Sequence, residues 1–198
     1  MVQAKIILAS ASPRRKELLR SLLGNFGLSF KVIPSDIDEF IPGVSKTPGK
    51  LVCGLSRYKA DYIAKKHKGI IIAADTIVVI KDKILGKPES NSDAWKMLSI
   101  LSGNYHYVYT GVTIAQKELE KYYTFFEKTK VYFRNISRKE IDFYIKSCSS
   151  LDKAGSYGIQ DDFGSTFVTK IKGDFFNVVG LPIVKTYLGL KKFIELGI

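Results

Sequence analysis

An unbroken apolar run, Gly69-Ile70-Ile71-Ile72-Ala73-Ala74, constrains the fold of this chain more than any other segment. Polar residues do not alternate with the apolar ones, which predicts a central strand that is covered on both faces. Such strands are typical of sheets with helices packed on each side. The run ends at Asp75-Thr76, so we expect a carboxylate to lie where a buried strand emerges.

Helical and strand patterns alternate along the rest of the chain, which predicts an α/β fold around a mixed, twisted sheet flanked by helices. Ser12-Pro13 has the hydroxyl cap and the proline that begin a helix, and Ser137 with Glu140 has the spacing of a capping box. Further helices are expected from residues 47–48, from a cap at Ser92, and after Leu181-Pro182. Expected strands cover residues 6–9, 30–33, 69–74, 77–80, 84–85, 105–115, 122–126 and 129–133, with a further pair around 172–174.

The chain has 198 residues, enough for one sizeable core, so we expect a single domain over residues 1–198 or two closely packed lobes. A hydrophobic content of 45% excludes disorder as the main state. Cys53 and Cys148 lie far apart and only two histidines accompany them, which gives neither a zinc-ligand spacing nor a disulfide framework. No apolar run approaches the ~18 residues that span a bilayer, so we expect a cytoplasmic protein without a membrane partner.

The balance of charge favours an anionic partner. Lys and Arg outnumber Asp and Glu by 31 to 19, which gives a formal net charge of +12. Much of a lysine excess can serve only to solubilise a surface, so this charge does not identify the anion. A nucleic-acid-binding protein is one alternative, and a regulatory protein that binds nucleotides without turnover is another. We rank nucleic-acid binding second to catalysis, because a pure binder needs no carboxylate at the end of a buried strand.

The loop Ala9-Ser10-Ala11-Ser12 precedes a helix that begins with Arg14 and Arg15. Free backbone N–H groups and the helix dipole attract anions there, and the two guanidinium groups add bidentate donors for a phosphate. The same residue types also begin ordinary surface helices, so the local sequence leaves both interpretations open.

Other charged residues are candidates for the same chemistry. Asp75 either activates water or caps a turn. Glu39, which ends an acidic stretch, is an oxygen ligand for a hard cation such as Mg²⁺ or a solvated loop charge. Lys59 and Lys87 either reach phosphates as point charges or lie in solvent.

Short motifs in a fixed order cover nearly the whole chain and together resemble the Maf family of nucleotide pyrophosphatases. The motifs are Leu8-Ala9-Ser10-Ala11-Ser12-Pro13-Arg14-Arg15, Ala74-Asp75-Thr76, Gly86-Lys87-Pro88, Tyr109-Thr110-Gly111-Val112, Gly155-Ser156-Tyr157-Gly158-Ile159-Gln160 and Val179-Gly180-Leu181-Pro182.

The resemblance implies hydrolysis of a nucleoside triphosphate to the monophosphate and pyrophosphate, with Mg²⁺ or Mn²⁺, and it is consistent with a homodimer. The implied fold is similar to that of inosine triphosphate pyrophosphatases, with two lobes around a cleft. Asp75 matches the family's catalytic carboxylate. The family's polar cleft positions correspond to Ser10, Arg14, Arg15, Glu39, Lys59 and Lys87.

Three residues carry the implied base preference. Arg14, Thr76 and Gln160 resemble the set found in the branch that acts on dTTP and UTP, and the Gln160 amide offers both a donor and an acceptor to a pyrimidine. The chain departs from the family pattern directly after Gln160, where Asp161-Asp162-Phe163-Gly164 is one residue longer than the usual turn.

Overall fold

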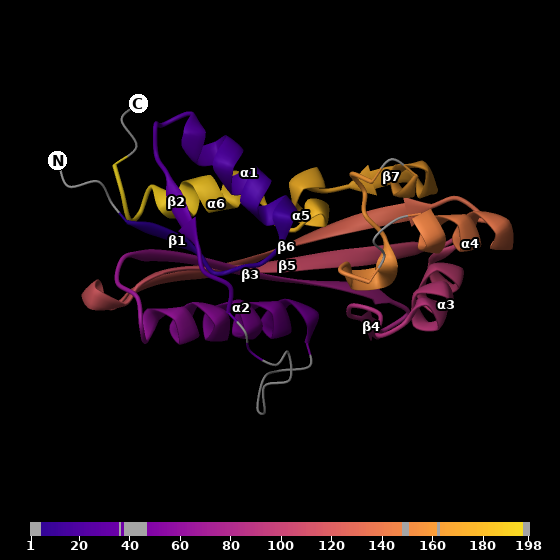
Figure 1. Cartoon of the computed structure of the whole chain (residues 1–198), viewed down its shortest axis with the longest axis horizontal. Helices are drawn as coiled ribbons and strands as arrows, with labels where there is room; N and C mark the ends of the chain where they lie inside the picture. The colour runs from indigo at the N-terminus through magenta and orange to yellow at the C-terminus, as the bar shows by residue number, and fades with distance from the viewer. Residues whose placement is uncertain (1–4, 36, 38–46, 148–150, 162, 196–198) are drawn as a thin grey trace. The chain divides into compact units, whose positions relative to one another are not determined.

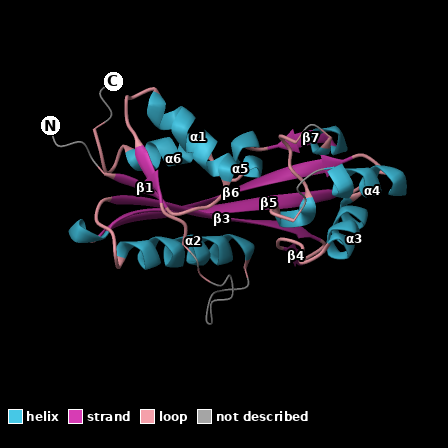
Figure 2. Ribbon diagram, in the orientation of Figure 1, coloured by secondary structure: helices cyan, strands magenta, loops and turns pink. Residues whose placement is uncertain are grey.

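The structure is a computed structural model that describes residues 5–35, 37, 47–147, 151–161 and 163–195. Helices and strands alternate along the chain (Figure 1, Figure 2). In chain order they are β1 (Ile6–Leu8), α1 (Pro13–Gly24), β2 (Phe30–Val32), α2 (Pro48–Ala64), β3 (Ile70–Ile80), β4 (Lys83–Leu85), α3 (Asn91–Leu101), β5 (Tyr105–Gln116), η1 (Lys117–Leu119), β6 (Lys121–Phe133), α4 (Arg138–Ser147), η2 (Ala154–Ser156), η3 (Gly164–Phe167), β7 (Val168–Lys172), α5 (Phe175–Val179) and α6 (Ile183–Leu190).

The strands form one mixed sheet in the order β2-β1-β3-β5-β6-β7, and β4 pairs with β3. Strand β1 runs parallel to β2 and β3, whereas β3 with β4 and β6 with β7 are antiparallel pairs. This arrangement confirms the predicted α/β class with a mixed sheet.

The prediction that the buried strand ends at Asp75-Thr76 is wrong, because β3 continues to Ile80. The apolar pattern resumes at residue 77, and the polar pair between the two apolar runs does not interrupt the extended backbone.

The chain divides into two compact units. The first unit comprises Met1–Asp75, Thr110–Glu127 and Gly180–Ile198, and the second comprises Thr76–Tyr109 and Lys128–Val179. This division agrees with two lobes, while the single domain and the cleft stay predictions. Among the described residues, no helix is long and apolar enough to cross a membrane.

Helices cover both faces of the strands in the first unit (Figure 1). On one face, Ile70 and Ile72 of β3 pack in a cluster with Leu19 of α1 and Leu190 of α6. Ile71 and Ala73, on the other face, pack in a cluster with Ala60 and Ile63 of α2. The all-apolar composition of β3 follows from this double coverage, as the sequence predicts.

A separate core fills the second unit. Val78, Leu98, Val108, Tyr144 and Phe167 are buried together and come from β3, α3, β5, α4 and η3. Helices α3 and α4 lie side by side over this core (Figure 1). Each unit therefore has its own apolar core, and both draw on the long strands β3, β5 and β6.

Three further expectations differ from the structure. The strands expected at residues 122–126 and 129–133 are one continuous strand, β6. The cap of α3 is Ser90 rather than Ser92, because the Ser90 hydroxyl accepts a hydrogen bond from the Asp93 N–H at 3.1 Å. The strand pair around residues 172–174 is also wrong. Only β7 forms, and Asp174 then accepts a hydrogen bond from the Phe176 N–H at 2.8 Å, which favours the short helix α5 over a second strand.

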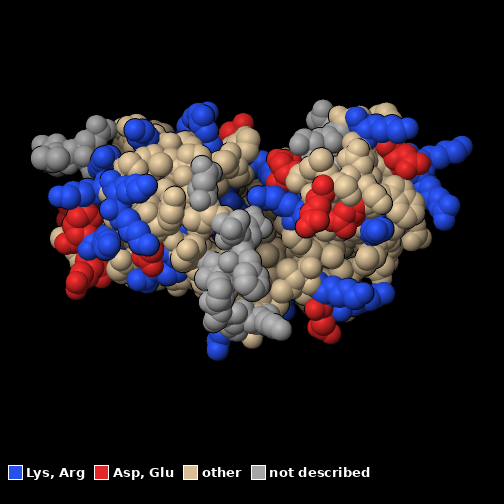
Figure 3. All heavy atoms as spheres, turned by 60° about the horizontal axis from the view of Figure 1, so that its bottom comes forward, with Lys and Arg blue, Asp and Glu red and all other residues tan. Residues whose placement is uncertain are grey.

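Basic side chains gather in several separate groups on the face seen in Figure 3, and acidic side chains lie beside some of these groups. The net charge is therefore divided on this face rather than concentrated in one patch. A divided charge agrees with a role of many lysines in solubility.

Candidate active site

Asp75 lies within β3, with only 6% of the residue exposed. Side chains alternate between the two faces of a strand, so Asp75 shares the face of Ile71 and Ala73, which α2 covers. A carboxylate in this position needs a partner, because an unpaired buried charge is strongly unfavourable.

Lys59 of α2 supplies that partner. Its Nζ donates a hydrogen bond to Oδ1 of Asp75, and the two side chains are 12% and 8% exposed. The helix stays close to the sheet through contacts in its preceding turns. The Ser56 hydroxyl lies 3.0 Å from the Thr113 hydroxyl, and a Cβ at Gly111 would lie 2.3 Å from the Val52 carbonyl carbon. Gly111 is therefore needed for the approach that brings Lys59 to Asp75.

The loop between β1 and α1 forms a second polar group. Oγ of Ser10 accepts hydrogen bonds from Nη1 of Arg15 at 3.2 Å and from the Ser12 N–H at 3.3 Å. The Ser12 hydroxyl caps α1 by accepting from the Arg15 N–H at 3.4 Å, as the sequence predicts. Nε of Arg15 also donates to the Gly180 carbonyl at 2.9 Å. These contacts fix the Arg15 guanidinium at the N-terminus of the helix.

The register of the sheet relates this loop to Asp75. Leu8 is paired with Ile72 in parallel strands, and the Ala9 N–H donates to the Ile72 carbonyl at 2.8 Å. The loop therefore begins at Ser10, beside the segment of β3 that leads to Asp75. The carboxyl ends of parallel strands are the usual ligand sites of α/β sheets.

The predicted set also contains Arg14 and Glu39, which precede Asp75 in the sequence. Arg14 is half-buried in the first turn of α1, next to Arg15. Glu39 lies outside the described residues, so its role as a metal ligand stays a prediction. Within the described ranges, no cluster of three or more His, Cys, Asp or Glu side chains is placed to hold a metal ion.

Cys53 is half-buried on α2, and burial raises the pKa of its thiol. A raised pKa keeps the sulfur protonated and unreactive. This agrees with a role of Cys53 in packing.

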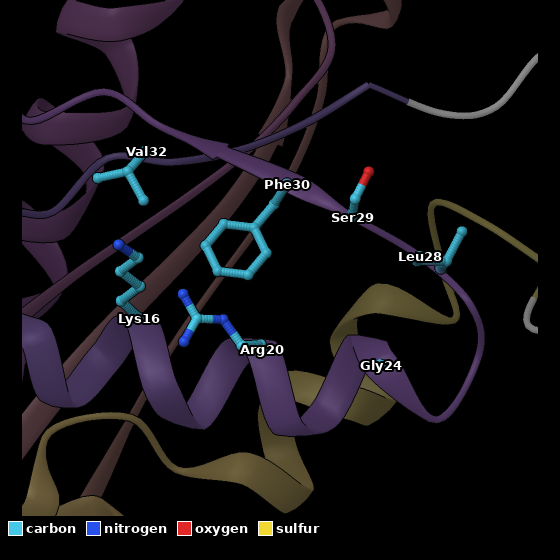
Figure 4. Close-up of a pocket in the computed structure, with 7 residues that line it drawn as sticks. All are labelled: Lys16, Arg20, Gly24, Leu28, Ser29, Phe30 and Val32. Atoms are coloured by element: carbon cyan, nitrogen blue, oxygen red, sulfur yellow. The ribbon is translucent and has the colours of Figure 1, made fainter.

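A groove of about 200 Å³ lies between α1 and β2 (Figure 4). Arg20 projects from the helix toward Phe30 of the strand, and Lys16 projects toward Val32. The groove is lined by Lys16, Arg20, Gly24, Leu28, Ser29, Phe30 and Val32, and therefore by none of the predicted site residues.

The remaining predicted residues lie in the second unit. Thr76 follows Asp75 in β3 and faces the opposite side of the strand, the side of Val78. A Cβ at Gly155 would lie 3.0 Å from Val78, and the Gly155 N–H donates to the Gly86 carbonyl at 3.0 Å. The segment that ends at Gln160 therefore contacts the backbone directly before Lys87. Lys87 and Gln160 are both exposed.

A buried histidine and tyrosine support that segment, and the position of His106 among strand aromatics already favours a core residue over a catalyst. Nε2 of His106 lies 2.7 Å from the Tyr157 hydroxyl, and both residues lie against Phe133. Burial lowers the pKa of His106 to about 3 and raises the pKa of Tyr157. The imidazole therefore stays neutral at physiological pH, as expected of a core histidine that holds a neighbouring hydroxyl.

Comparison with known proteins identifies the family. The family model described as Maf-like protein matches residues 5–193. The chain belongs to the Maf family. It is 50% identical over 190 residues to a dTTP/UTP pyrophosphatase of Thermoanaerobacter sp. (strain X514), a match that covers 95% of this chain and 96% of the relative. It is 51% identical over 183 residues to a dTTP/UTP pyrophosphatase of Thermosipho africanus, covering 92% and 90% of the two chains.

The solved structures support the fold of this Maf-family chain. A HAM1 protein from Coxiella burnetii superposes with a TM-score of 0.52 at 14% sequence identity, and the match covers 96% of this chain and 99% of the HAM1 protein. At this level of identity the likeness concerns the fold alone. It confirms the predicted α/β fold for this chain.

Asp161, the first residue at which the chain departs from the family pattern, is firmly held. Oδ2 of Asp161 accepts a hydrogen bond from the Tyr144 hydroxyl at 2.7 Å and lies 3.2 Å from Nζ of Lys153, which is buried. The Tyr144 hydroxyl in turn accepts from the Gly158 N–H at 3.0 Å. The Tyr144 hydroxyl thus links α4 to the Gly158 backbone before Gln160 and to the Asp161 side chain after it. The sequence did not reveal this contact, because Asp161 and Tyr144 lie in different predicted elements.

Proposed function

We propose that this Maf-family chain hydrolyses the α–β phosphoanhydride of dTTP and UTP to the nucleoside monophosphate and pyrophosphate. The relatives that carry this activity in their names are about 50% identical over most of the chain. The single observation that carries the mechanism is the buried carboxylate of Asp75, held by the Lys59 ammonium on the face that α2 covers. Pure binding of nucleotide would not require an acidic group beside the triphosphate.

In the proposed reaction Asp75 acts on water. A carboxylate oxygen orients the water molecule and takes its proton while the water oxygen bonds to the α phosphorus. The bond between that phosphorus and the bridging oxygen breaks, and its electron pair leaves on pyrophosphate. Lys59 restricts the rotation of the carboxylate through its hydrogen bond, so the acceptor oxygen is oriented before substrate arrives.

Four cations of the predicted site are the proposed phosphate ligands. The Arg15 guanidinium is already oriented by Ser10 and by the Gly180 carbonyl, which lowers the entropic cost of binding an anion. Arg14 adds a second fork at the same helix N-terminus, where the helix dipole favours negative charge. We assign Lys59 and Lys87 to the same triphosphate as point charges.

A divalent cation, Mg²⁺ or Mn²⁺, fits the donor set of this proposal. Mg²⁺ is commonly bound by one or two carboxylates together with substrate phosphates, and Glu39 would supply one such carboxylate. When bound, the cation would neutralise charge on the phosphate oxygens. The proposal assigns Glu39 to the metal and Asp75 to the water, as the family resemblance implies.

Base preference is assigned to Arg14, Thr76 and Gln160. The Gln160 amide can donate to one oxygen and accept from one N–H of a uracil or thymine ring. Its exposed position, within a segment held at Gly158 and Asp161, supports a recognition role. A cytoplasmic location and a homodimer stay predictions.

Product analysis tests the proposal. The purified chain is incubated with each canonical triphosphate and Mg²⁺ or Mn²⁺, and monophosphate, diphosphate, pyrophosphate and inorganic phosphate are quantified. Equal amounts of monophosphate and pyrophosphate, formed fastest from dTTP and UTP, are expected. Diphosphate with inorganic phosphate would move cleavage to the terminal bond, and equilibrium binding without any product would instead support a nucleotide-binding regulator.

A further inference from the structure

In the second unit, one face of the sheet carries tyrosine side chains on β5 beside lysine side chains on β6. Strand β5 turns His106 and Val108 toward the core, so Tyr105, Tyr107 and Tyr109 face the opposite side. Strand β6 turns Thr129, Val131 and Phe133 inward in the same way, which leaves Lys128, Lys130 and Tyr132 on the side of the three tyrosines. We call this set of three tyrosines, two lysines and Tyr132 the tyrosine–lysine face.

Contacts within the face confirm that these side chains share one side of the sheet. Nζ of Lys130 lies 3.5 Å from the centre of the Tyr105 ring, and Nζ of Lys128 lies 4.0 Å from the centre of the Tyr107 ring. The Tyr105 and Tyr132 rings are 5.9 Å apart. Tyr105 remains 52% exposed and Lys128 is exposed as well. The rings and ammonium groups thus form a continuous array that water reaches.

Strand β7 extends the positive charge of this face. Lys172 is paired with Lys130, and Lys170 is paired with Tyr132, so both lysines point to the same side as their partners. Both are exposed. The strand pattern therefore adds two cations to the two of β6 and places no acidic residue among these eight positions.

A ligand that complements this surface must combine negative charges at regular intervals with flat groups that stack on aromatic rings. We infer that the tyrosine–lysine face binds single-stranded nucleic acid, with the phosphates on the lysines of β6 and β7 and the bases against the tyrosines of β5. Aromatic platforms within positively charged surfaces are the general means of binding single strands without sequence preference. From net charge alone, nucleic-acid binding ranks second to catalysis. The pairing of the strands adds tyrosine rings beside the lysine charges.

The physical chemistry favours this ligand over other occupants. Cation–π contacts at exposed sites are weak, so a phosphate can draw a lysine ammonium away from a ring and leave the ring open to a base. In duplex DNA the bases are already stacked on one another, so only the phosphates would contribute. A second copy of this face would bring lysines against lysines, which disfavours a homodimer through it.

Fluorescence anisotropy of the full-length protein tests the inference. The probes are a labelled oligo(dT) and a labelled oligo(U) of about 12 nucleotides, a length within the range of single-strand sites. A duplex of the same length and vesicles that contain anionic phospholipid are the comparison ligands. We expect the single strands to bind more tightly than the duplex, with an affinity that falls steeply as salt is added.

Two variants separate charge from stacking. Lys128→Gln/Lys130→Gln removes two phosphate contacts and should lower the slope of log affinity against log salt by about 1.4 for a single strand. Tyr105→Leu/Tyr107→Leu removes the rings but keeps apolar side chains, and it should weaken binding by about tenfold or more. The matched control is Lys139→Gln/Lys146→Gln, which removes the same charge from exposed positions of α4 in the same unit.

The outcomes decide between the alternatives. The inference holds if the two face variants weaken single-strand binding while the control stays close to the unmodified protein. It is overturned if the control loses as much affinity as Lys128→Gln/Lys130→Gln, if the tyrosine variant binds normally, or if only the vesicles bind. Unchanged circular dichroism and unchanged nucleotide hydrolysis in the face variants exclude misfolding as the cause, and they separate this surface from the proposed catalytic function.

Discussion

The Lys59 ammonium and the Asp75 carboxylate form an ion pair between the middle of α2 and the middle of β3. Both side chains are nearly buried, so each charge is stabilised chiefly by the other. Helix α2 therefore contributes to the site in two ways, because it covers the apolar residues before Asp75 and also supplies the cation that the carboxylate needs.

Replacement of the carboxylate tests its proposed catalytic role. Asp75→Asn keeps the size of the side chain and a hydrogen-bonding oxygen but removes the base, so turnover of dTTP should fall by about 10²–10⁴. Circular dichroism should be unchanged. The measurement is pyrophosphate release under saturating substrate. Asp61→Asn, which alters a half-exposed acid paired with Arg57 on α2, is the control and should retain activity. Normal turnover by folded Asp75→Asn would remove Asp75 from the mechanism.

The ion pair also makes a prediction about stability. Lys59→Met leaves the Asp75 carboxylate buried without its cation, so the free energy of unfolding should fall by about 3–5 kcal/mol. The double variant Lys59→Met/Asp75→Asn removes both charges and should recover part of that loss while remaining inactive. Denaturant unfolding of the four proteins measures the coupling. Additive effects of the two substitutions would show that the pair is not energetically coupled.

Short stretches of sequence are sufficient to predict the start of α1 and the strand that leads to Asp75. The hydroxyl and proline at Ser12-Pro13 set the start of α1, and the apolar run before Asp75 set the central strand. Both features depend on residues that are adjacent in the sequence, so they can be predicted without knowledge of the fold. The apolar residues after Thr76 were assigned to a separate strand, because an acidic residue inside a buried strand is expected only when its partner is known.

Contacts between distant segments were not visible in the sequence. The Gly180 carbonyl receives the Arg15 guanidinium across 165 residues, and the Tyr144 hydroxyl reaches Asp161 from another element. The alternation of Tyr105 and Tyr107 with Lys128 and Lys130 exists only once β5 is beside β6. Strand order and register decide such contacts, and neither follows from residue types within one strand.

Arg15 should be sensitive to a change that preserves its charge. Arg15→Lys cannot donate simultaneously to Ser10 and to Gly180 in the geometry of a guanidinium, so the cation would lose its fixed orientation. We expect KM for dTTP to rise and the free energy of unfolding to fall by about 1.5–3 kcal/mol. Steady-state kinetics and thermal unfolding measure the two effects. Arg20→Lys, an exposed position on the same helix, is the control, and an equal change in both variants would contradict this assignment.

His106 should make the stability of the protein depend on pH. Its pKa is about 3 in the folded chain, because burial disfavours the charged ring, and near 6.5 when the chain is unfolded. Between these values the unfolded state binds the extra proton, so stability is complete above about pH 6.5 and is lost as the pH falls toward 3. A change from about pH 7.5 to about pH 5 should cost about 2 kcal/mol through this residue.

Denaturant unfolding at the two pH values measures this loss. His106→Gln keeps a donor for the Tyr157 hydroxyl and cannot titrate, so its stability should fall less over the same interval. Glu140 does not interfere there. Hydrogen bonds from Arg134 and Ser137 lower the pKa of Glu140 to about 2, so its contribution is lost only below its ordinary value of 4.5. Equal losses in the unmodified protein and in His106→Gln would contradict a buried neutral imidazole.

The Tyr144 hydroxyl should control base preference through the segment that carries Gln160. Tyr144→Phe leaves the Gly158 N–H without its acceptor and Asp161 without one donor, so this backbone becomes less ordered. Because small displacements of a positioning group are costly, the ratio of kcat/KM for dTTP to that for dCTP should fall by about tenfold or more.

Leu98→Ala, which opens a cavity in the same core, lowers stability without touching this network and is the control. If both variants leave the ratio unchanged, Tyr144 has only a structural role, whereas a loss confined to Tyr144→Phe links the hydroxyl to recognition of the base.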